Sequence, residues 1–165
     1  MRNLKKNLSS SLKGAERIAV LGIGSELRAD DIAGILVAQD LEKLKNQNFK
    51  VFLGYTAPEN LSGEIRKFKP THLIMIDTAD IGKNPGEVEM FTPENVGGIS
   101  FSTHKLPVKI MAQFLQKDID CKVMIIGIQP KTLEFGKNIS KEAKSAVAKL
   151  TEALQSVLAH TLSKV

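Results

Sequence analysis

The 165-residue sequence lacks tryptophan and has only one tyrosine and one cysteine. With so few aromatic side chains, it offers little on which single-stranded nucleic acid could stack, and its net charge of +5 comes from lysines spread along the chain. A single cysteine cannot form an internal disulfide, which fits a reducing compartment. No apolar run approaches the roughly 18 residues of a membrane span, and "MRNLKKNLSSSLKGAER" has no apolar signal-peptide core. We therefore expect a cytoplasmic protein without nucleic-acid binding or membrane insertion.

A complete nucleotide-binding fingerprint is also lacking, although "LGIGSELRADDIAG" contains part of one. A dinucleotide loop needs a third glycine at the position where this sequence has Leu27. The helix that follows would begin with Asp30 and Asp31, whose negative charge repels a phosphate group. Gly22 and Gly24 therefore predict a tight turn that presents a carboxylate. Nucleotide binding stays as a rival hypothesis, which a rise in melting temperature with NAD or ATP would support.

Apolar runs alternate with helical patterns along the chain. Strands are predicted at residues 17–24, 50–55, 71–77, 87–91 and 121–127, with 87–91 at an edge because its polarity alternates. Helices are predicted at residues 30–44, within 57–70, at 107–117 and from Ser140 onwards, and a short one is marked by Leu4, Leu8 and Leu12. This order predicts an α/β fold, a three-layer α/β/α sandwich with a five-stranded, mostly parallel twisted sheet. We expect one domain over residues 1–165, with residues 1–16 as a helical extension.

Side chains that could carry chemistry follow the predicted carboxyl ends of strands. One of Asp30 and Asp31 follows the first strand, Asp77 ends the third strand, and His104 lies in a loop before a helix. Because carboxyl ends of parallel strands share one edge of the sheet, these groups can converge there. Two carboxylates and an imidazole suit a divalent transition metal. Helix capping by the aspartate pair, a loop hydrogen bond for Asp77 and a surface position for His104 stay open alternatives.

The remaining titratable residues of interest have simpler interpretations. Asp80 falls in a turn, and His72 falls at the opposite sheet edge, where a structural role is expected. His160 is expected on the surface of the last helix, and Cys121 as a buried structural thiol. No serine lies in a G-x-S-x-G elbow, so a serine hydrolase is poorly supported.

Four segments occur in order: "LGIGSELRADDIAG", "APENLSGEIRKFKPTHLIMIDTADIGKNPGE", "STHKLP" and "IGIQP". Together they resemble the hydrogenase maturation endopeptidases, most closely the branch that processes the large subunit of hydrogenase-3-type enzymes. The resemblance covers about residues 17–155 and leaves residues 1–16 unexplained. It implies an α/β/α fold and an endopeptidase that removes the C-terminal peptide of the nickel–iron hydrogenase large-subunit precursor after nickel insertion.

The resemblance also implies which residues bind metal and catalyse: Asp31 as the second of the acidic pair, Asp77, and His104. The metal implied is nickel supplied by the precursor, so that only the loaded precursor is cut, and another divalent ion such as Zn or Cd could occupy the site. Asp30 and Asp80 lie in the same motifs and could orient the ligands. Attack on the peptide bond by a metal-activated water or by a carboxylate both remain open.

Two further hypotheses complete the sequence-based account. Residues 57–60 and 96–102 are expected near the same edge of the sheet and are candidates to contact the precursor. The main rival function is a non-catalytic nickel-sensing or nickel-binding module on the same scaffold. A processing assay separates the two functions.

Overall fold

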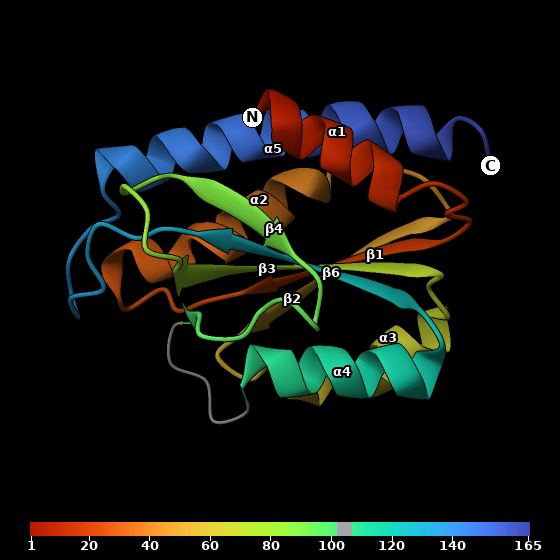
Figure 1. The fold of residues 1–165 in the computed structure, drawn as a ribbon, viewed down its shortest axis with the longest axis horizontal. Coiled ribbons are helices and arrows are strands. Elements are labelled where there is room, and N and C mark those ends of the chain that lie inside the picture. Colours follow the sequence, from red (N-terminus) through yellow and green to blue (C-terminus); the bar gives the residue numbers. More distant parts are fainter. Residues whose placement is uncertain (102–106) are drawn as a thin grey trace.

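A computed structural model describes residues 1–101 and 107–165, and its central feature is a mostly parallel sheet (Figure 1). The strand order is β2-β1-β3-β6-β4. Four of these strands run parallel: β1 (Ile18–Ile23), β2 (Phe49–Tyr55), β3 (His72–Asp80) and β6 (Lys122–Ile128). β4 (Val88–Phe91) runs antiparallel to β6 at the edge, as its alternating sequence predicts.

A sixth strand, β5 (Ser100–Phe101), pairs antiparallel with the end of β3. The predicted count of five strands missed it, because two residues are too few to produce an alternating pattern. Its pairing partners are Ala79 and Asp80, which lie two and three residues beyond Asp77 in the same strand. This short strand therefore holds part of the 96–102 segment against the carboxyl end of β3.

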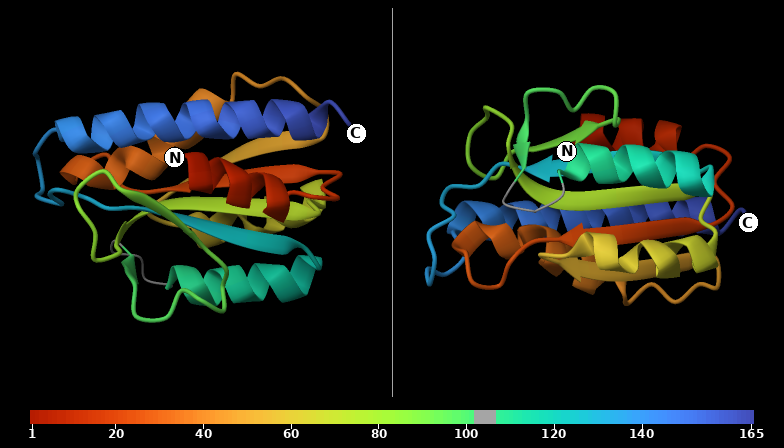
Figure 2. Two further views of the ribbon diagram at one scale, coloured as in Figure 1. Left: turned by 45° about the horizontal axis from the view of Figure 1, so that its top comes forward. Right: turned by 90° about the horizontal axis from the view of Figure 1, so that it is seen from below.

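Helices cover both faces of the sheet and give the three predicted layers (Figures 1 and 2). On one face lie α1 (Arg2–Ser11), α2 (Ala33–Leu41) and α5 (Lys141–Leu162). On the other face, α3 (Ser62–Phe68) and α4 (Val108–Ile119) lie side by side, as the right view of Figure 2 shows. The helix predicted over 30–44 is shorter than expected, because residues 29–32 form a 3₁₀ turn, η1 (Ala29–Ile32), and α2 ends at Leu41.

Alternation along the central strands divides the apolar side chains between two cores. In β3, Ile74 and Ile76 belong to the core under α1, α2 and α5, whereas Leu73 and Met75 belong to the core under α3 and α4. Because successive side chains of a strand point to opposite faces, the next residue, Asp77, falls on the α3/α4 side. Each fully buried aliphatic side chain contributes about 1.5–3 kcal/mol to folding.

The N-terminal helix completes one of these cores. Leu4, Leu8 and Leu12 are buried in the core that α5 also lines, and α1 contacts α5 directly. Gly14, three residues after the end of this helix, has a φ of 80°, a backbone conformation that favours glycine. The segment that the family resemblance left unexplained thus covers apolar surface of α5. No helix in the described ranges is both long and apolar enough to cross a membrane.

His72 begins β3 at the amino ends of the parallel strands, where its register partners are Ile18 and Lys122. It is therefore at the opposite edge of the sheet from Asp77, as predicted. Its side chain is buried, and Nδ1 lies 3.0 Å from the Thr71 hydroxyl. Burial lowers the pKa of His72 from its ordinary value of 6.5, and the positive charge of Lys122 lowers it further, against a hydrogen bond to the Ser11 backbone.

This lowered pKa makes folding sensitive to acid. The unfolded chain takes up a proton on His72 near pH 6.5 and the folded chain only at lower pH, so the stability that the neutral imidazole supports is lost as the pH falls through its folded pKa. We predict that His72→Gln loses less free energy of unfolding than the wild type between about pH 7.5 and about pH 5. Urea titrations at both values measure this, with exposed His160→Gln as the control. Equal losses in the wild type and His72→Gln would contradict the prediction.

Candidate active site

The candidate site lies where the chain leaves β1 and β3 at their carboxyl ends. β1 stands between β2 and β3, and its connection through α2 leads to β2, away from β3. The carboxyl ends of β1 and β3 therefore form a topological switch point, the place where open α/β sheets bind ligands. Asp30 and Asp31 follow β1 in η1, and Asp77 lies near the end of β3. The structure thus brings the predicted aspartates to one edge.

Two glycines allow the η1 turn and α2 to pack closely against the sheet. A Cβ on Gly24, whose φ is 151°, would collide with the backbone carbonyl of Asp31. A Cβ on Gly34 would overlap the carbonyl oxygens of Ile76 and Ile23. Gly24 was expected as part of a tight turn, whereas the sequence-based account assigned no role to Gly34. Close approach of helix to strand is the reason for a glycine there.

A side-chain hydrogen bond adds to this contact. The Thr78 hydroxyl donates to the backbone carbonyl of Asp30 across 3.0 Å and so ties the end of β3 to η1. The backbone amide of Thr78 donates to Oδ1 of Asp77 across 2.8 Å, which helps to fix the orientation of that carboxylate. Asp31 and Asp77 therefore sit on two elements that are in direct contact.

Both of these carboxylates are buried, with exposed fractions of 1% for Asp31 and 0% for Asp77. Both lie at the predicted edge of the sheet, but neither is reachable by solvent in this structure. The physical reason is the close packing of η1 onto the strand ends, which the glycine contacts allow. Substitutions at these positions consequently need to preserve shape, and asparagine is a better test than alanine.

Asp30 has a different role from its neighbour, because its carboxylate holds the loop between β6 and α5. The backbone amides of Lys131 and Thr132 donate to Oδ2 across 2.8 and 3.3 Å. Ser140 donates twice, through its amide to Oδ1 at 2.6 Å and through its hydroxyl to Oδ2 at 2.9 Å. The same Ser140 hydroxyl accepts from the Ala143 amide and caps α5, as predicted. Asp30 therefore links η1 to the start of the last helix and does not cap α2.

Removing this link should lower the stability of the fold. We predict that Asp30→Ala reduces the free energy of unfolding by about 2–4 kcal/mol, because it leaves several partly buried donors of residues 131–140 without their acceptor. The control is Asp40→Ala, which removes an exposed ion pair to Lys43 and should cost under about 1 kcal/mol. Denaturant unfolding measures both. A stability of Asp30→Ala close to that of the wild type would show that the link carries little of the fold.

Asp80 has the turn role that its position predicts. Its Oδ1 accepts hydrogen bonds from the Gly82 amide at 3.2 Å and from Gln129 Nε2 at 3.3 Å. Gln129, at the end of β6, in turn accepts from the Ile81 amide across 2.8 Å. Together they shape the chain that leaves β3, three residues beyond Asp77.

His104 lies outside the described residues. The described chain reaches Phe101, which pairs with Ala79, two residues beyond Asp77. Within residues 1–101 and 107–165, no group of three or more histidine, cysteine, aspartate or glutamate side chains could hold a metal ion. The described part of the candidate site therefore consists of the carboxylates of Asp31 and Asp77.

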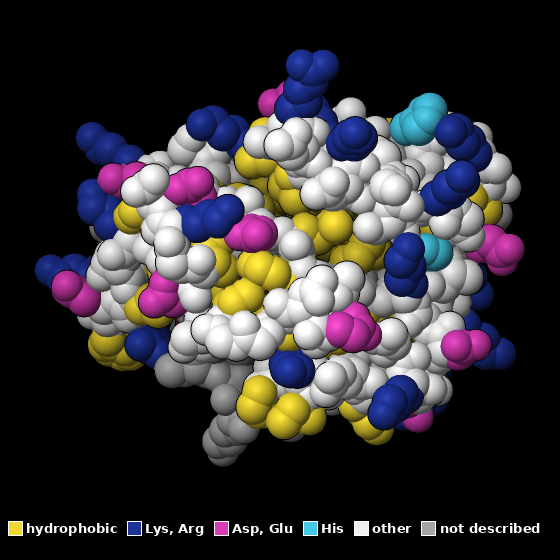
Figure 3. Space-filling view, in the orientation of Figure 1, with side chains coloured by type: hydrophobic (Ala, Val, Ile, Leu, Met, Phe, Trp, Pro, Cys, Tyr) yellow, Lys and Arg dark blue, Asp and Glu magenta, His cyan; other side chains and the backbone are white. Residues whose placement is uncertain are grey.

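Other candidates from the sequence lie away from this edge. His160 is exposed on α5, and Cys121 is buried, with burial raising the pKa of its thiol to about 11. Both match their predicted roles. Lysine and arginine side chains are scattered over the face in Figure 3 and do not form a continuous basic patch there.

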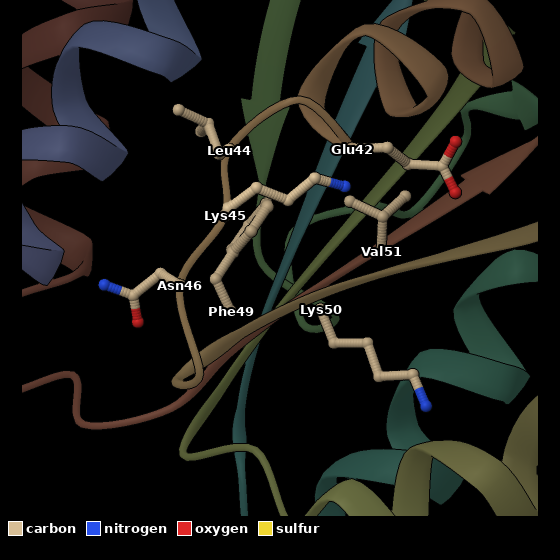
Figure 4. A pocket seen from close by; sticks show the side chains of 7 residues that line it. All are labelled: Glu42, Leu44, Lys45, Asn46, Phe49, Lys50 and Val51. Carbon is tan, nitrogen blue, oxygen red and sulfur yellow. The ribbon is translucent and has the colours of Figure 1, made fainter.

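A surface hollow of about 280 Å³ is also separate from the candidate site. Figure 4 shows its lining, which includes Glu42, Lys45, Phe49 and Lys50 from the loop after α2 and the start of β2. This position is at the amino end of β2, whereas Asp31 and Asp77 lie at the carboxyl ends of their strands. The hollow therefore does not contribute to the site.

Comparison with known proteins assigns this architecture to a family. A family model described as hydrogenase maturation protease matches residues 35–157. The chain belongs to the hydrogenase maturation protease family. It is an enzyme that acts on peptide bonds, and the resemblance drawn from the four sequence segments is confirmed.

Relatives of this hydrogenase maturation protease span nearly the whole chain. A Methanocaldococcus jannaschii protein that carries the same family name is 34% identical over 163 residues, which cover 94% of this chain and 96% of the relative. The hydrogenase 3 maturation protease of Escherichia coli K12 is 32% identical over 137 residues, covering 82% and 87%. The crystal structure of a [NiFe] hydrogenase maturation protease HycI from Thermococcus kodakarensis matches with a TM-score of 0.85 and 29% identity, covering 92% and 98%.

Proposed function

We propose that this protease removes the C-terminal peptide of a nickel–iron hydrogenase large-subunit precursor after nickel has been inserted. The observation that carries the proposal is the pair of buried carboxylates, Asp31 and Asp77, at the switch point of a hydrogenase maturation protease fold. The names of the relatives support the substrate class, since one is named for hydrogenase 3 and another for a [NiFe] hydrogenase.

The proposed basis of selectivity is recognition of the precursor's nickel by Asp31, Asp77 and His104. Two carboxylates with one imidazole form a donor set that suits a divalent transition ion, so Zn or Cd could also bind there. His104 follows Phe101 by three positions, and Phe101 pairs next to the strand end that carries Asp77. A precursor without nickel would offer these residues nothing to bind and would stay uncut.

Hydrolysis breaks the peptide C–N bond, adds the water oxygen to the carbonyl carbon and returns a proton to the leaving nitrogen. A carboxylate at this edge can accept the proton of the attacking water and later release it to the amine. Direct attack by a carboxylate is the other route, followed by hydrolysis of the resulting anhydride. Both routes require Asp31 and Asp77 to be held in a fixed orientation, which the packing of η1 on β3 provides.

We predict that Asp31→Asn and Asp77→Asn each lower the rate of precursor processing by at least about 100-fold, because asparagine keeps the shape but removes the anionic ligand and base. The measurement is a shift in precursor size after incubation with nickel-loaded and nickel-free precursor. Asp80→Asn is the matched control, because this carboxylate lies on the same strand and serves the turn. Melting temperatures of all variants confirm that they are folded.

Rapid cleavage of the loaded precursor by either asparagine variant would remove that residue from the site. Equal cleavage of loaded and nickel-free precursor by the wild type would contradict nickel recognition. If the wild type binds the loaded precursor but does not cleave it, the nickel-sensing module is the better description.

A further inference from the structure

Glu59 belongs to residues 57–60, the segment expected from the sequence to contact the precursor, and no particular role has so far been given to its carboxylate. It lies in a 3₁₀ turn, η2 (Pro58–Leu61), directly after the carboxyl end of β2. A Cβ on Gly54 would come within 2.8 Å of Pro58 and 3.1 Å of the Gly22 carbonyl oxygen, so η2 is packed on the ends of β2 and β1. The β2–α3 connection thus joins the edge that carries Asp31.

The face of the sheet on which η2 lies also places Glu59 near the candidate site. η2 leads directly into α3, which covers the face toward which the alternation of β3 directs Asp77. Figure 1 shows the connection from β2 into α3 at the end of the sheet where the β3 and β6 strand arrows finish. Glu59 therefore belongs to an element that borders the candidate site on the α3/α4 side.

The environment of this side chain is unusual for a structural carboxylate. Its Oε2 atom is buried, and no donor in the described part of the chain hydrogen-bonds to it. The described ion pairs do not include Glu59, although the sequence contains 23 lysines and arginines. Because a buried oxygen without a donor destabilises the fold, such a group calls for a functional explanation.

A role as an additional metal ligand does not fit. In the described ranges, the aspartates and Glu59 do not form a group that could hold a metal ion. A carboxylate accepts hydrogen bonds only, and its strongest non-metal partners are the charged donors of lysine and arginine. The best donor for the buried oxygen of Glu59 is therefore a cationic side chain of another molecule.

We propose that Glu59 is a specificity-determining residue that binds a lysine or arginine side chain of the precursor near the cleaved bond. This inference rests on the proposed function, because it assumes that the precursor occupies the edge that carries Asp31 and Asp77. The pairing gives the buried oxygen a donor only when the substrate is bound. It selects precursors by a basic residue, in addition to the selection by nickel.

The test compares Glu59→Gln with the wild type on nickel-loaded precursor and on precursors in which single basic residues near the processed end are changed to glutamine. We expect Glu59→Gln to lower kcat/KM by about 10- to 100-fold, mainly through KM. One precursor variant should show the same loss with the wild-type enzyme and no further loss with Glu59→Gln. Glu64→Gln, which changes an exposed carboxylate in the first turn of α3, is the control and should process like the wild type.

A second variant separates recognition from a structural role. Glu59→Met removes the buried oxygen that lacks a donor but keeps the length of the side chain, so its melting temperature should equal or exceed that of the wild type while kcat/KM falls. A lower melting temperature with unchanged KM would overturn the proposal, because it would make Glu59 a structural residue.

Other outcomes also decide the question. A wild-type kcat/KM in Glu59→Gln would overturn the inference and leave the proposed function intact. The same holds if the loss in kcat/KM from Glu59→Gln multiplies with the loss from every precursor variant, because no basic residue of the precursor would then depend on Glu59. If the wild type cleaves no nickel-loaded precursor at all, the proposed function fails, and the role of Glu59 fails with it.

Discussion

The structure depends on the close approach of the turn after β1 to the carboxyl end of β3. This approach is possible because Gly24, after β1, leaves room for the backbone carbonyl of Asp31 in the turn. Gly34, in the first turn of α2, leaves room for the carbonyls of Ile23 and Ile76 at the ends of β1 and β3. The Thr78 hydroxyl then bonds the carbonyl of Asp30. Without this contact, Asp31 on η1 would be less well fixed relative to Asp77 on β3, and a shared metal would have to order the two carboxylates at an entropic cost.

The adjacent residues Asp30 and Asp31 have different roles at this edge of the sheet. Asp30 is fully buried and accepts hydrogen bonds from Lys131, Thr132 and Ser140, which fixes the loop between β6 and α5. Asp31 lies on the same turn, so the hydrogen bonds of Asp30 also restrict the position of Asp31. A buried anion is costly unless its environment stabilises it, so such an arrangement is expected where a site needs carboxylates in fixed positions.

The sequence predicted most of this architecture because its signals are local. Apolar runs marked the four parallel strands, and alternating polarity marked β4. Ser140 marked the start of α5, and the leucines at 4, 8 and 12 marked α1. Three features could not be predicted, because they depend on contacts distant in sequence. These are the two-residue strand β5, the role of Gly34 against Ile76, and the burial of Asp31 and Asp77. Likewise, nothing local in "DD" shows that the first aspartate bonds a loop about 100 residues away.

The central claim is that Asp31, Asp77 and His104 bind one nickel ion. The most direct measurement is a crystal structure of the protein with Ni²⁺, located by its anomalous scattering. The account predicts a single ion with carboxylate oxygens of Asp31 and Asp77 and a ring nitrogen of His104 at about 2.0–2.2 Å, the range of such bonds to divalent transition metals. An ion bound elsewhere, or one that leaves either aspartate out of its coordination, would contradict the claim.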